Sequence, residues 1–281
     1  QEEKSDESIP GRYQGSAATV DLTELFPEKS KTPPVPPKKA PLPSPNIQQT
    51  ERGDIRPINQ SVGFPNSGYL QNSTSLLERQ TALDFKAFFE LVSPQRKTHF
   101  GTYEMAEIQT QIGNYIHENY SRKLYVSNIS SARGGLLKPH ASHQNGLDVD
   151  LGYIADNPNL KFPLVVKTSS KQYFSENISI EKTYNLFMHL FMQNEIPIER
   201  IFVDQKIKNE LCKFAKTQFA QTQRTQSEVT PEHKNAIKTM FITLQHVEGH
   251  GDHFHLRIRC SKFDPACRDR IYKKMDDCLF N

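Results

Sequence analysis

Two histidine-rich segments that are far apart in the chain carry residue types that bind transition metals. The first is "PHASHQNGLDVD", residues 139–150, and the second is "HVEGHGDHFHLRIRC", residues 246–260. The second segment alone holds four of the ten histidines of the 281-residue chain. Imidazole nitrogens and carboxylate oxygens together suit Zn²⁺. The sequence therefore predicts a metal site wherever the fold brings the two segments together.

In the first segment, His143 precedes Asp150 by seven residues, and Gly146 between them permits a tight turn into a strand. Side chains alternate between the two faces of a strand, so Asp148 and Asp150 share one face. The apolar residues between and beside the two acids are expected to enter the core. Paired carboxylates on one strand face are usually solvated, so this segment alone does not establish a site.

In the second segment, the same alternation aligns His253, His255 and Arg257 on one face of a strand with an apolar reverse face. Histidines held on a rigid element meet a requirement of metal sites. An H-x6-D segment followed by an HxH pair is also much rarer than an HxH pair alone. Two imidazoles and one carboxylate would leave a coordination position for water, whose pKa zinc lowers to about 7. Such a hydrolytic site needs a base, for which His253, His250 and Asp252 are candidates.

Both helices and strands are needed to position these residues. Apolar residues three and four positions apart predict helices. These are expected at 102–120, 181–194 and 205–216. Strands are expected at 123–130, 146–154 and 200–204. Residues 239–246 and 253–259 are expected to form an antiparallel pair joined by the "VEGHGD" turn. Because helices and strands do not alternate regularly, the predicted class is α+β, with an antiparallel central sheet flanked by helices.

The N-terminal part of the chain differs from the rest in composition. Nine of the 18 prolines lie within the first 45 residues, and "KTPPVPPKKAPLPSP" (31–45) offers little to bury. We therefore expect residues 1–58 to be a disordered Pro-rich segment and residues 59–281 to form the folded domain. The segment would act as a spacer or as a ligand for a proline-binding module.

Composition also argues against two classes of partner. The formal net charge is only +3, and no basic run alternates with aromatic residues, so no nucleic acid is expected. No apolar stretch approaches the roughly 18 residues of a transmembrane segment. The chain begins at Gln1, which fits either a cleaved secretory signal or a trimmed chain.

The four cysteines all lie near the C-terminus and match no CxxC metal or redox pattern. They are Cys212, Cys260, Cys267 and Cys278. Their even number allows two disulfides in three connectivities, or four reduced thiols in a cytosolic protein.

Both histidine segments resemble those of the penicillin-insensitive murein endopeptidases. These belong to a larger group with lysostaphin-type peptidases, D-Ala-D-Ala metallopeptidases and hedgehog domains. The resemblance extends to "SVGFPNSGYL" (61–70), "ARGG" (132–135) and "ERIFVDQKIKNELC" (199–212), and covers roughly residues 60–280. It implies a hedgehog or D-Ala-D-Ala metallopeptidase-like fold. It also implies a periplasmic protein whose signal peptide has been removed or is not part of the chain.

The activity implied by the resemblance is that of a zinc-dependent metallo-endopeptidase. Its substrates would be peptidoglycan stem peptides, cut at the cross-link between D-alanine and a diamino acid. Because no serine is acylated, β-lactams should not inhibit it. The alternatives are a carboxypeptidase that removes terminal D-alanine and a non-catalytic, zinc-containing wall-binding protein. The presence of both His253 and His250 favours an enzyme.

The resemblance also assigns individual residues near the metal. His143, Asp150 and His255 would bind zinc, and His140 would be a further ligand or a neighbour of the ligands. His253 would act as the base or stabilise the transition state.

Further residues complete the implied site. His250 would line it, and Asp148 would orient a ligand or the substrate. Related dipeptidases carry a glutamate base at the position of Asp252, so the identity of the base stays open. Arg133 or Arg257 would bind a substrate carboxylate. For Arg257, a solvated position on the strand is the alternative.

The resemblance pairs Cys260 with Cys267 and Cys212 with Cys278. Many family members carry a further cysteine where this chain has Tyr69, so one of the usual disulfides is missing.

Overall fold

The computed structural model describes residues 47–49, 55–58, 60–81, 88–157, 177–193, 195–224, 230–270 and 278. All of them belong to one compact unit, residues 34–281. Most of the predicted Pro-rich segment 1–58 lies outside the described residues. Its described part contains β1 (Ile47–Gln49) and β2 (Ile55–Pro57), which pair antiparallel.

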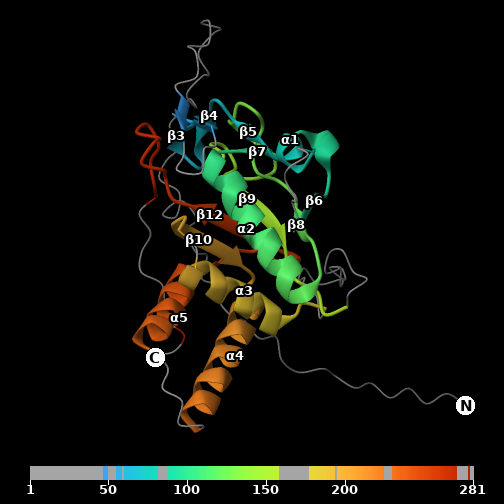
Figure 1. The fold of residues 1–281 in the computed structure, drawn as a ribbon, viewed down its shortest axis with the longest axis vertical. Helices are drawn as coiled ribbons and strands as arrows, with labels where there is room; N and C mark the ends of the chain where they lie inside the picture. Colours follow the sequence, from blue (N-terminus) through green and yellow to red (C-terminus); the bar gives the residue numbers. More distant parts are fainter. Residues whose placement is uncertain are drawn as a thin grey trace, which may run out of the picture. The chain divides into compact units, whose positions relative to one another are not determined.

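One six-stranded sheet carries the two histidine segments (Figure 1). Its strands lie in the order β11 (Leu244–His246), β10 (Ile198–Val203), β12 (His253–Ile258), β9 (Asp148–Gly152), β8 (Leu124–Val126) and β6 (Phe89–Leu91). The four central strands pair antiparallel, whereas β11 and β6 pair in parallel with their neighbours. The α+β class is therefore as predicted, but the sheet is mixed.

The predicted antiparallel pair of residues 239–246 and 253–259 is wrong. Pro231–Thr243 forms helix α5, and β11 pairs in parallel with β10, which lies between β11 and β12. The helix begins with Pro231 in its first turn, and the side chain of Thr230 accepts a hydrogen bond from the amide of His233 at 3.2 Å. Buried residues then follow helical spacing at Ala236, Ile237, Met240 and Phe241.

The three predicted helices are present as α2 (Tyr103–Tyr120), α3 (Ile180–Gln193) and α4 (Gln205–Arg224). Figure 1 shows α2 lying across one face of the sheet. The helix buries Met105, Ile108, Ile112 and Ile116, at the spacing that predicted it. From α3, Phe187 packs against Phe254 on the apolar face of β12, with ring centroids 5.1 Å apart. These contacts support the strands from behind the site.

The remaining described elements are short, and some of them contact the loop that carries the first histidine segment. They are β3 (Ser61–Phe64), β4 (Ser67–Leu70), β5 (Thr74–Ser75), α1 (Leu76–Thr81), the 3-10 helix η1 (Pro94–Arg96) and β7 (Phe100–Gly101). Gly134 has a φ of 68° and lies against β4 and the loop before β9. A Cβ there would collide with the backbone of Gln144 and Leu70. The close approach explains the glycine of "ARGG".

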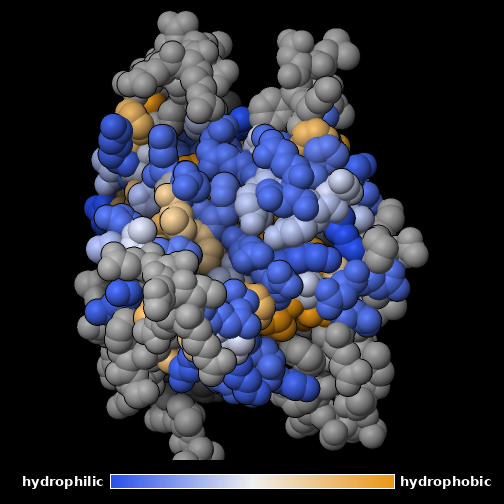
Figure 2. All heavy atoms as spheres, turned by 60° about the horizontal axis from the view of Figure 1, so that its bottom comes forward, coloured by the Kyte–Doolittle hydropathy of each residue, from blue (hydrophilic) through white to orange (hydrophobic). Residues whose placement is uncertain are grey.

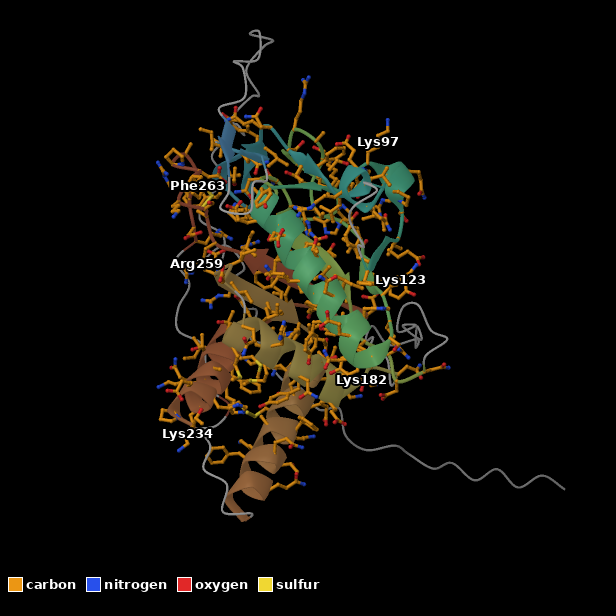
Figure 3. All side chains as sticks on the ribbon, viewed as in Figure 1. Lys97, Lys123, Lys182, Lys234, Arg259 and Phe263 are labelled. Carbon is orange, nitrogen blue, oxygen red and sulfur yellow. A yellow bond between two sulfur atoms is a disulfide. The ribbon has the colours of Figure 1, made fainter. Side chains whose placement is uncertain are left out.

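The expected disulfides Cys212–Cys278 and Cys260–Cys267 are both formed. Figure 3 shows the described side chains as sticks around the ribbon, with Arg259 at the end of β12. Hydrophilic residues dominate the coloured surface in Figure 2. None of the helices among the described residues is long and apolar enough to cross a membrane.

Candidate metal centre

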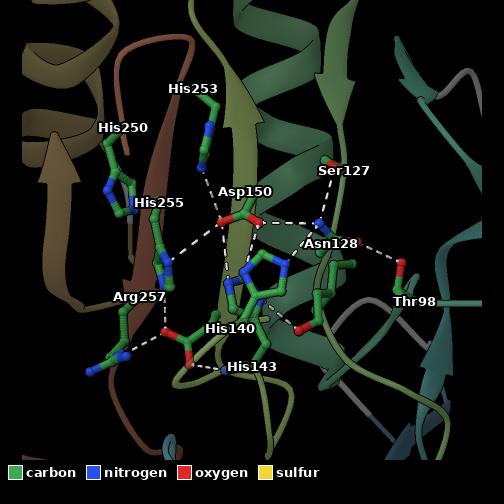
Figure 4. Close-up of polar contacts among 12 residues, drawn as sticks. Thr98, Ser127, Asn128, His140, His143, Asp150, His250, His253, His255 and Arg257 are labelled. Carbon is green, nitrogen blue, oxygen red and sulfur yellow. Dashed lines mark hydrogen bonds and ion pairs between the residues drawn. The ribbon is translucent and has the colours of Figure 1, made fainter. Parts of the chain in front are cut away.

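Strands β9 and β12 lie side by side and bring the two predicted segments together. Their register pairs Asp150 with His255 and Asp148 with Arg257. Directly paired residues project to the same face of a sheet, so these four side chains share one face. Figure 4 shows this face, with α2 behind the strands. Paired carboxylates on a strand face are usually solvated, but all five residues of β9, including Asp148 and Asp150, are buried.

The carboxylate of Asp150 lies at the centre of four imidazoles (Figure 4). Its Oδ1 is 3.2 Å from Nε2 of His143, 3.5 Å from Nδ1 of His255 and 3.8 Å from Nε2 of His253. Its Oδ2 is 3.7 Å from Nδ1 of His140. The structure therefore gathers the predicted ligands around one carboxylate.

The atoms at this centre fit a bound cation. Nε2 of His143 and Oδ1 of Asp150 are both buried, and neither forms a hydrogen bond with any described residue. Two ligands that each lie about 2.1 Å from a tetrahedral zinc ion are separated by about 3.4 Å. The distances of 3.2 and 3.5 Å around Asp150 Oδ1 match that spacing. One donor atom from each of His140, His143 and Asp150 also lies within 4.8 Å of the other two.

His143 is held so that one ring nitrogen faces Asp150. Its Nδ1 donates to the carbonyl oxygen of Ile129 at 2.9 Å, and its backbone amide donates to Oδ2 of Asp148 at 3.1 Å. A carbonyl oxygen can only accept, so Nε2 keeps its lone pair in the neutral ring. Burial alone would lower the pKa of His143, but the nearby Asp150 carboxylate outweighs it and raises the pKa. A metal ion would therefore compete with a proton for Nε2.

His255 is fixed by Asp148 in a complementary way. Its Nε2 donates to Oδ1 of Asp148 at 2.6 Å, which leaves Nδ1 as the nitrogen that faces Asp150. Burial, with a smaller contribution from His143, lowers the pKa of His255 to about 4, so the ring is neutral near pH 7. Burial opposes a charge on Asp148, but Arg257 and His255 outweigh it and hold its pKa well below the usual range.

Asp252 lies behind His253 and does not face Asp150. Its Oδ1 accepts a hydrogen bond from Nδ1 of His253 at 2.6 Å, and Nε2 of the ring points toward Asp150 (Figure 4). Burial alone would lower the pKa of His253, but the bond to Asp252 and the charge of Asp150 raise it. The arrangement is that of an imidazole oriented by a carboxylate.

His250 lines the same site from the loop before β12. Its Nδ1 donates to the carbonyl oxygens of Val247 and Glu248 at 3.0 and 3.2 Å, so its other ring nitrogen can accept a hydrogen bond. Burial, and then the charge of His253, lowers the pKa of His250. Its ring centroid lies 5.0 Å from that of His253. The hydroxyl of Tyr153 donates to the backbone oxygen of His250 at 3.2 Å and fastens the loop to β9.

Asn128 belongs to the site, although the sequence did not indicate it. Its Nδ2 lies 3.2 Å from Nε2 of His140 and donates to Oδ2 of Asp150 at 3.4 Å. Its Oδ1 accepts from the hydroxyl of Thr98 at 3.0 Å, which holds the amide beside the site. An asparagine within a predicted strand carries no distinctive signal. Because β8 ends at Val126, Asn128 lies in the segment after the strand, and its side chain contacts His140 and Asp150.

Of the two arginines considered for substrate binding, Arg257 lies inside the protein. Its side chain is buried, and its Nε donates to Oδ1 of Asp148 at 2.6 Å. Both interpretations from the sequence, a substrate contact and a solvated strand residue, are therefore wrong. Arg133 is exposed on the turn before Gly134, where its backbone oxygen accepts from the amide of Leu70 at 3.0 Å. Its role at a substrate stays a prediction.

Comparisons with known proteins agree with the geometry. A family model described as penicillin-insensitive murein endopeptidase matches residues 61–279. A curated protein of Yersinia enterocolitica with the same description is 22% identical to this chain over 192 residues. The alignment covers 66% of this chain and 62% of that relative, so the chain spans less than two thirds of the relative's length.

Proposed function

This chain belongs to the penicillin-insensitive murein endopeptidase family, and from that premise we propose that it is a zinc-dependent endopeptidase acting on peptidoglycan. The proposed scissile bond is the cross-link between D-alanine and a diamino acid of the neighbouring stem peptide. The observation that carries the proposal is that Nε2 of His143 and Oδ1 of Asp150 are buried, face each other at 3.2 Å and have no other hydrogen-bond partner among the described residues. We also propose a periplasmic location and a hedgehog or D-Ala-D-Ala metallopeptidase-like fold, which the antiparallel order of the four central strands supports.

The proposed zinc ligands are His143 through Nε2, Asp150 through Oδ1 and His255 through Nδ1. Support comes from the hydrogen bonds that occupy the opposite nitrogen of each ring. When bound, zinc would polarise the scissile carbonyl and supply an activated water as nucleophile. His140 is proposed as a neighbour of the ligands, because the amide of Asn128 donates toward its Nε2 and so favours a proton on Nδ1. The substrate is proposed to approach from the side of His253, whose side chain is 22% exposed.

His253 is the proposed catalytic histidine of this chain. Its Nε2 faces the centre, where it can accept a proton from the attacking water and pass it to the leaving amine. Asp252 would stabilise the imidazolium that forms, because it already accepts the hydrogen bond of Nδ1. This geometry favours His253 over Asp252 as the base. His250 would bind the substrate beside it through its accepting ring nitrogen.

Digestion of purified cross-linked muropeptide dimers, with mass analysis of the products, tests the proposal. We expect monomers without free alanine, at a rate that penicillin does not change. Free D-alanine with intact dimers would instead establish the carboxypeptidase. A protein that holds stoichiometric zinc and yields neither product would establish the wall-binding alternative.

A further inference from the structure

A chain of buried charged groups lies directly behind His255. Oδ1 of Asp148 accepts hydrogen bonds from both Nε2 of His255 and Nε of Arg257, each at 2.6 Å. The same Nε of Arg257 also lies 3.8 Å from Oε2 of Glu199. Asp148, Arg257 and Glu199 are at most 3% exposed, so these charges interact with little screening by water.

Glu199 reaches this position through an irregularity in β10. The register between β10 and β12 shifts between Ile198 and Arg200, which makes Glu199 an extra residue on its strand. Such bulges redirect a side chain and recur next to active sites. The other carboxylate oxygen of Glu199 accepts from the amide of Arg270 at 2.7 Å. The bulge therefore anchors the acid between the sheet and the C-terminal segment.

The guanidinium of Arg257 is held in place by an aromatic ring as well as by the two carboxylates. Its Cζ lies over the ring of Phe202, 5.1 Å from the ring centroid. Phe202 itself contacts His255 edge to face at 4.9 Å. A guanidinium that lies over an aromatic ring while its Nε donates to a carboxylate is a geometry that lysine cannot reproduce fully.

We propose that Arg257, held beside Glu199, is a positioning residue for the metal centre, because it orients Asp148, the carboxylate that accepts hydrogen bonds from both His143 and His255. Asp148 contacts the backbone amide of His143 through Oδ2 and the ring of His255 through Oδ1. The loop before β9 and the strand β12 are thus joined through a single side chain. The inference rests on the proposed metal function but not on the identity of the substrate.

Loss of Arg257 would leave Asp148 buried beside His255 without its strongest cationic partner. An unpaired buried carboxylate either takes up a proton or draws in water, and both events turn it away from the histidines. Groups that orient metal ligands in this way typically change metal affinity by about 10- to 100-fold when removed. The centre would therefore bind zinc more weakly although every ligand is still present.

Zinc affinity, measured on the full chain by competition with a chromophoric chelator, tests the proposal without any substrate. We expect Arg257→Gln to weaken zinc binding about 10- to 100-fold and Arg257→Lys to restore part of the loss. Arg259→Gln is the matched control, because Arg259 follows the same strand, is 51% exposed and lies 3.7 Å from Asp269. It should bind zinc as the wild type does.

The proposal is overturned if folded Arg257→Gln binds zinc as tightly as the wild type, or if Arg257→Lys is no better than Arg257→Gln. Circular dichroism shows whether each variant is folded. If Arg257→Gln does not fold, Glu199→Gln decides: a several-fold weaker affinity at about pH 8 supports the proposal, and an unchanged affinity overturns it. Wild-type protein that binds zinc but leaves muropeptide dimers intact contradicts the proposed function alone.

Discussion

Two aspartates that look equivalent in the sequence have different surroundings in the fold. Asp148 and Asp150 share a strand face, and both have a pKa held below the usual range against the effect of burial. The first is satisfied by Arg257 and His255, whereas Oδ1 of the second has no hydrogen-bond donor among the described residues. The difference arises from the cross-strand neighbours. It supports the proposal that Asp150 faces the metal and that Asp148 positions the ligands.

At the residue scale, Asp252→Asn tests the proposed role of His253. The variant loses the charge that stabilises the imidazolium, so we expect kcat to fall about 100-fold or more, with KM nearly unchanged. Zinc content should also stay at the wild-type level, because Asp252 bonds to His253 and not to the proposed ligands. Steady-state kinetics on a muropeptide dimer provide the measurement. If the variant kept the wild-type kcat, the proposed role of Asp252 in stabilising the His253 imidazolium would be wrong.

A second prediction concerns Glu199 and the dependence of the free energy of unfolding on pH. Burial raises its pKa to about 7, although the charge of Arg257 opposes that change; Asp148 and Asp269 are the acids that add to it. A carboxyl with a raised pKa in the folded state stabilises the fold at low pH, and this contribution is lost as pH rises from about 4.5 through 7. The loss should amount to up to about 3 kcal/mol.

Urea unfolding of the metal-free protein at a series of pH values measures this effect. We expect the stability of Glu199→Gln to decline less than that of the wild type between about pH 4.5 and 7, because glutamine does not titrate. Parallel pH profiles for the variant and the wild type would show that Glu199 is not the titrating group.

At the scale of elements, alternation along β9 and β12 predicted which residues share a face, and the structure confirms it. The order of strands could not be predicted in the same way, because short apolar runs do not reveal their partners. The segment 239–246 shows the same ambiguity, since its apolar residues fit either a short strand or the end of a helix. Arg257 was misjudged because burial of a charged residue depends on partners from another strand, here Asp148 and Glu199.

A prediction at this scale concerns the contribution of the apolar reverse face of β12 to stability. Leu256 is 0% exposed and lies behind the two histidines of the strand. We expect Leu256→Ala to lower the free energy of unfolding by about 2–5 kcal/mol, because it leaves a cavity in the core. Leu136→Ala is the matched control, as Leu136 is 63% exposed and should change stability by less than about 0.5 kcal/mol. Denaturant unfolding of both variants measures the two changes. Equal losses of unfolding free energy would contradict the assignment of Leu256 to the core.

At the scale of the whole molecule, the C-terminal segment fastens distant parts of the fold together. The side chain of Asp264 accepts from the amide of Gln60 at 2.8 Å, and the amide of Gly63 donates to the oxygen of Ala266 at 3.0 Å. The Cys260–Cys267 disulfide closes this segment, and Cys212–Cys278 closes a much longer stretch. None of these partners is indicated by local sequence patterns. The pairing of the cysteines was expected only through family resemblance.

The two disulfides should contribute unequally to stability. Their sequence separations are 66 residues for Cys212–Cys278 and 7 for Cys260–Cys267. Loop-closure entropy then predicts a loss of about 4 kcal/mol when the first is replaced by a pair of serines, and about 2.5 kcal/mol for the second. Chemical unfolding of the two double variants measures both values. A larger loss for the short loop would show that contacts of the segment, and not chain entropy, dominate.

The central claim is that one metal centre, built from both histidine segments, carries out the hydrolysis. Bound zinc and the rate of dimer cleavage should therefore be measured together for the wild type, His255→Ala and His246→Ala. His246 belongs to the same histidine-rich segment but lies in β11, paired with Val203, and is the control. We predict that His255→Ala loses both zinc and cleavage, whereas His246→Ala keeps both. Cleavage by His255→Ala at the wild-type rate would contradict the account.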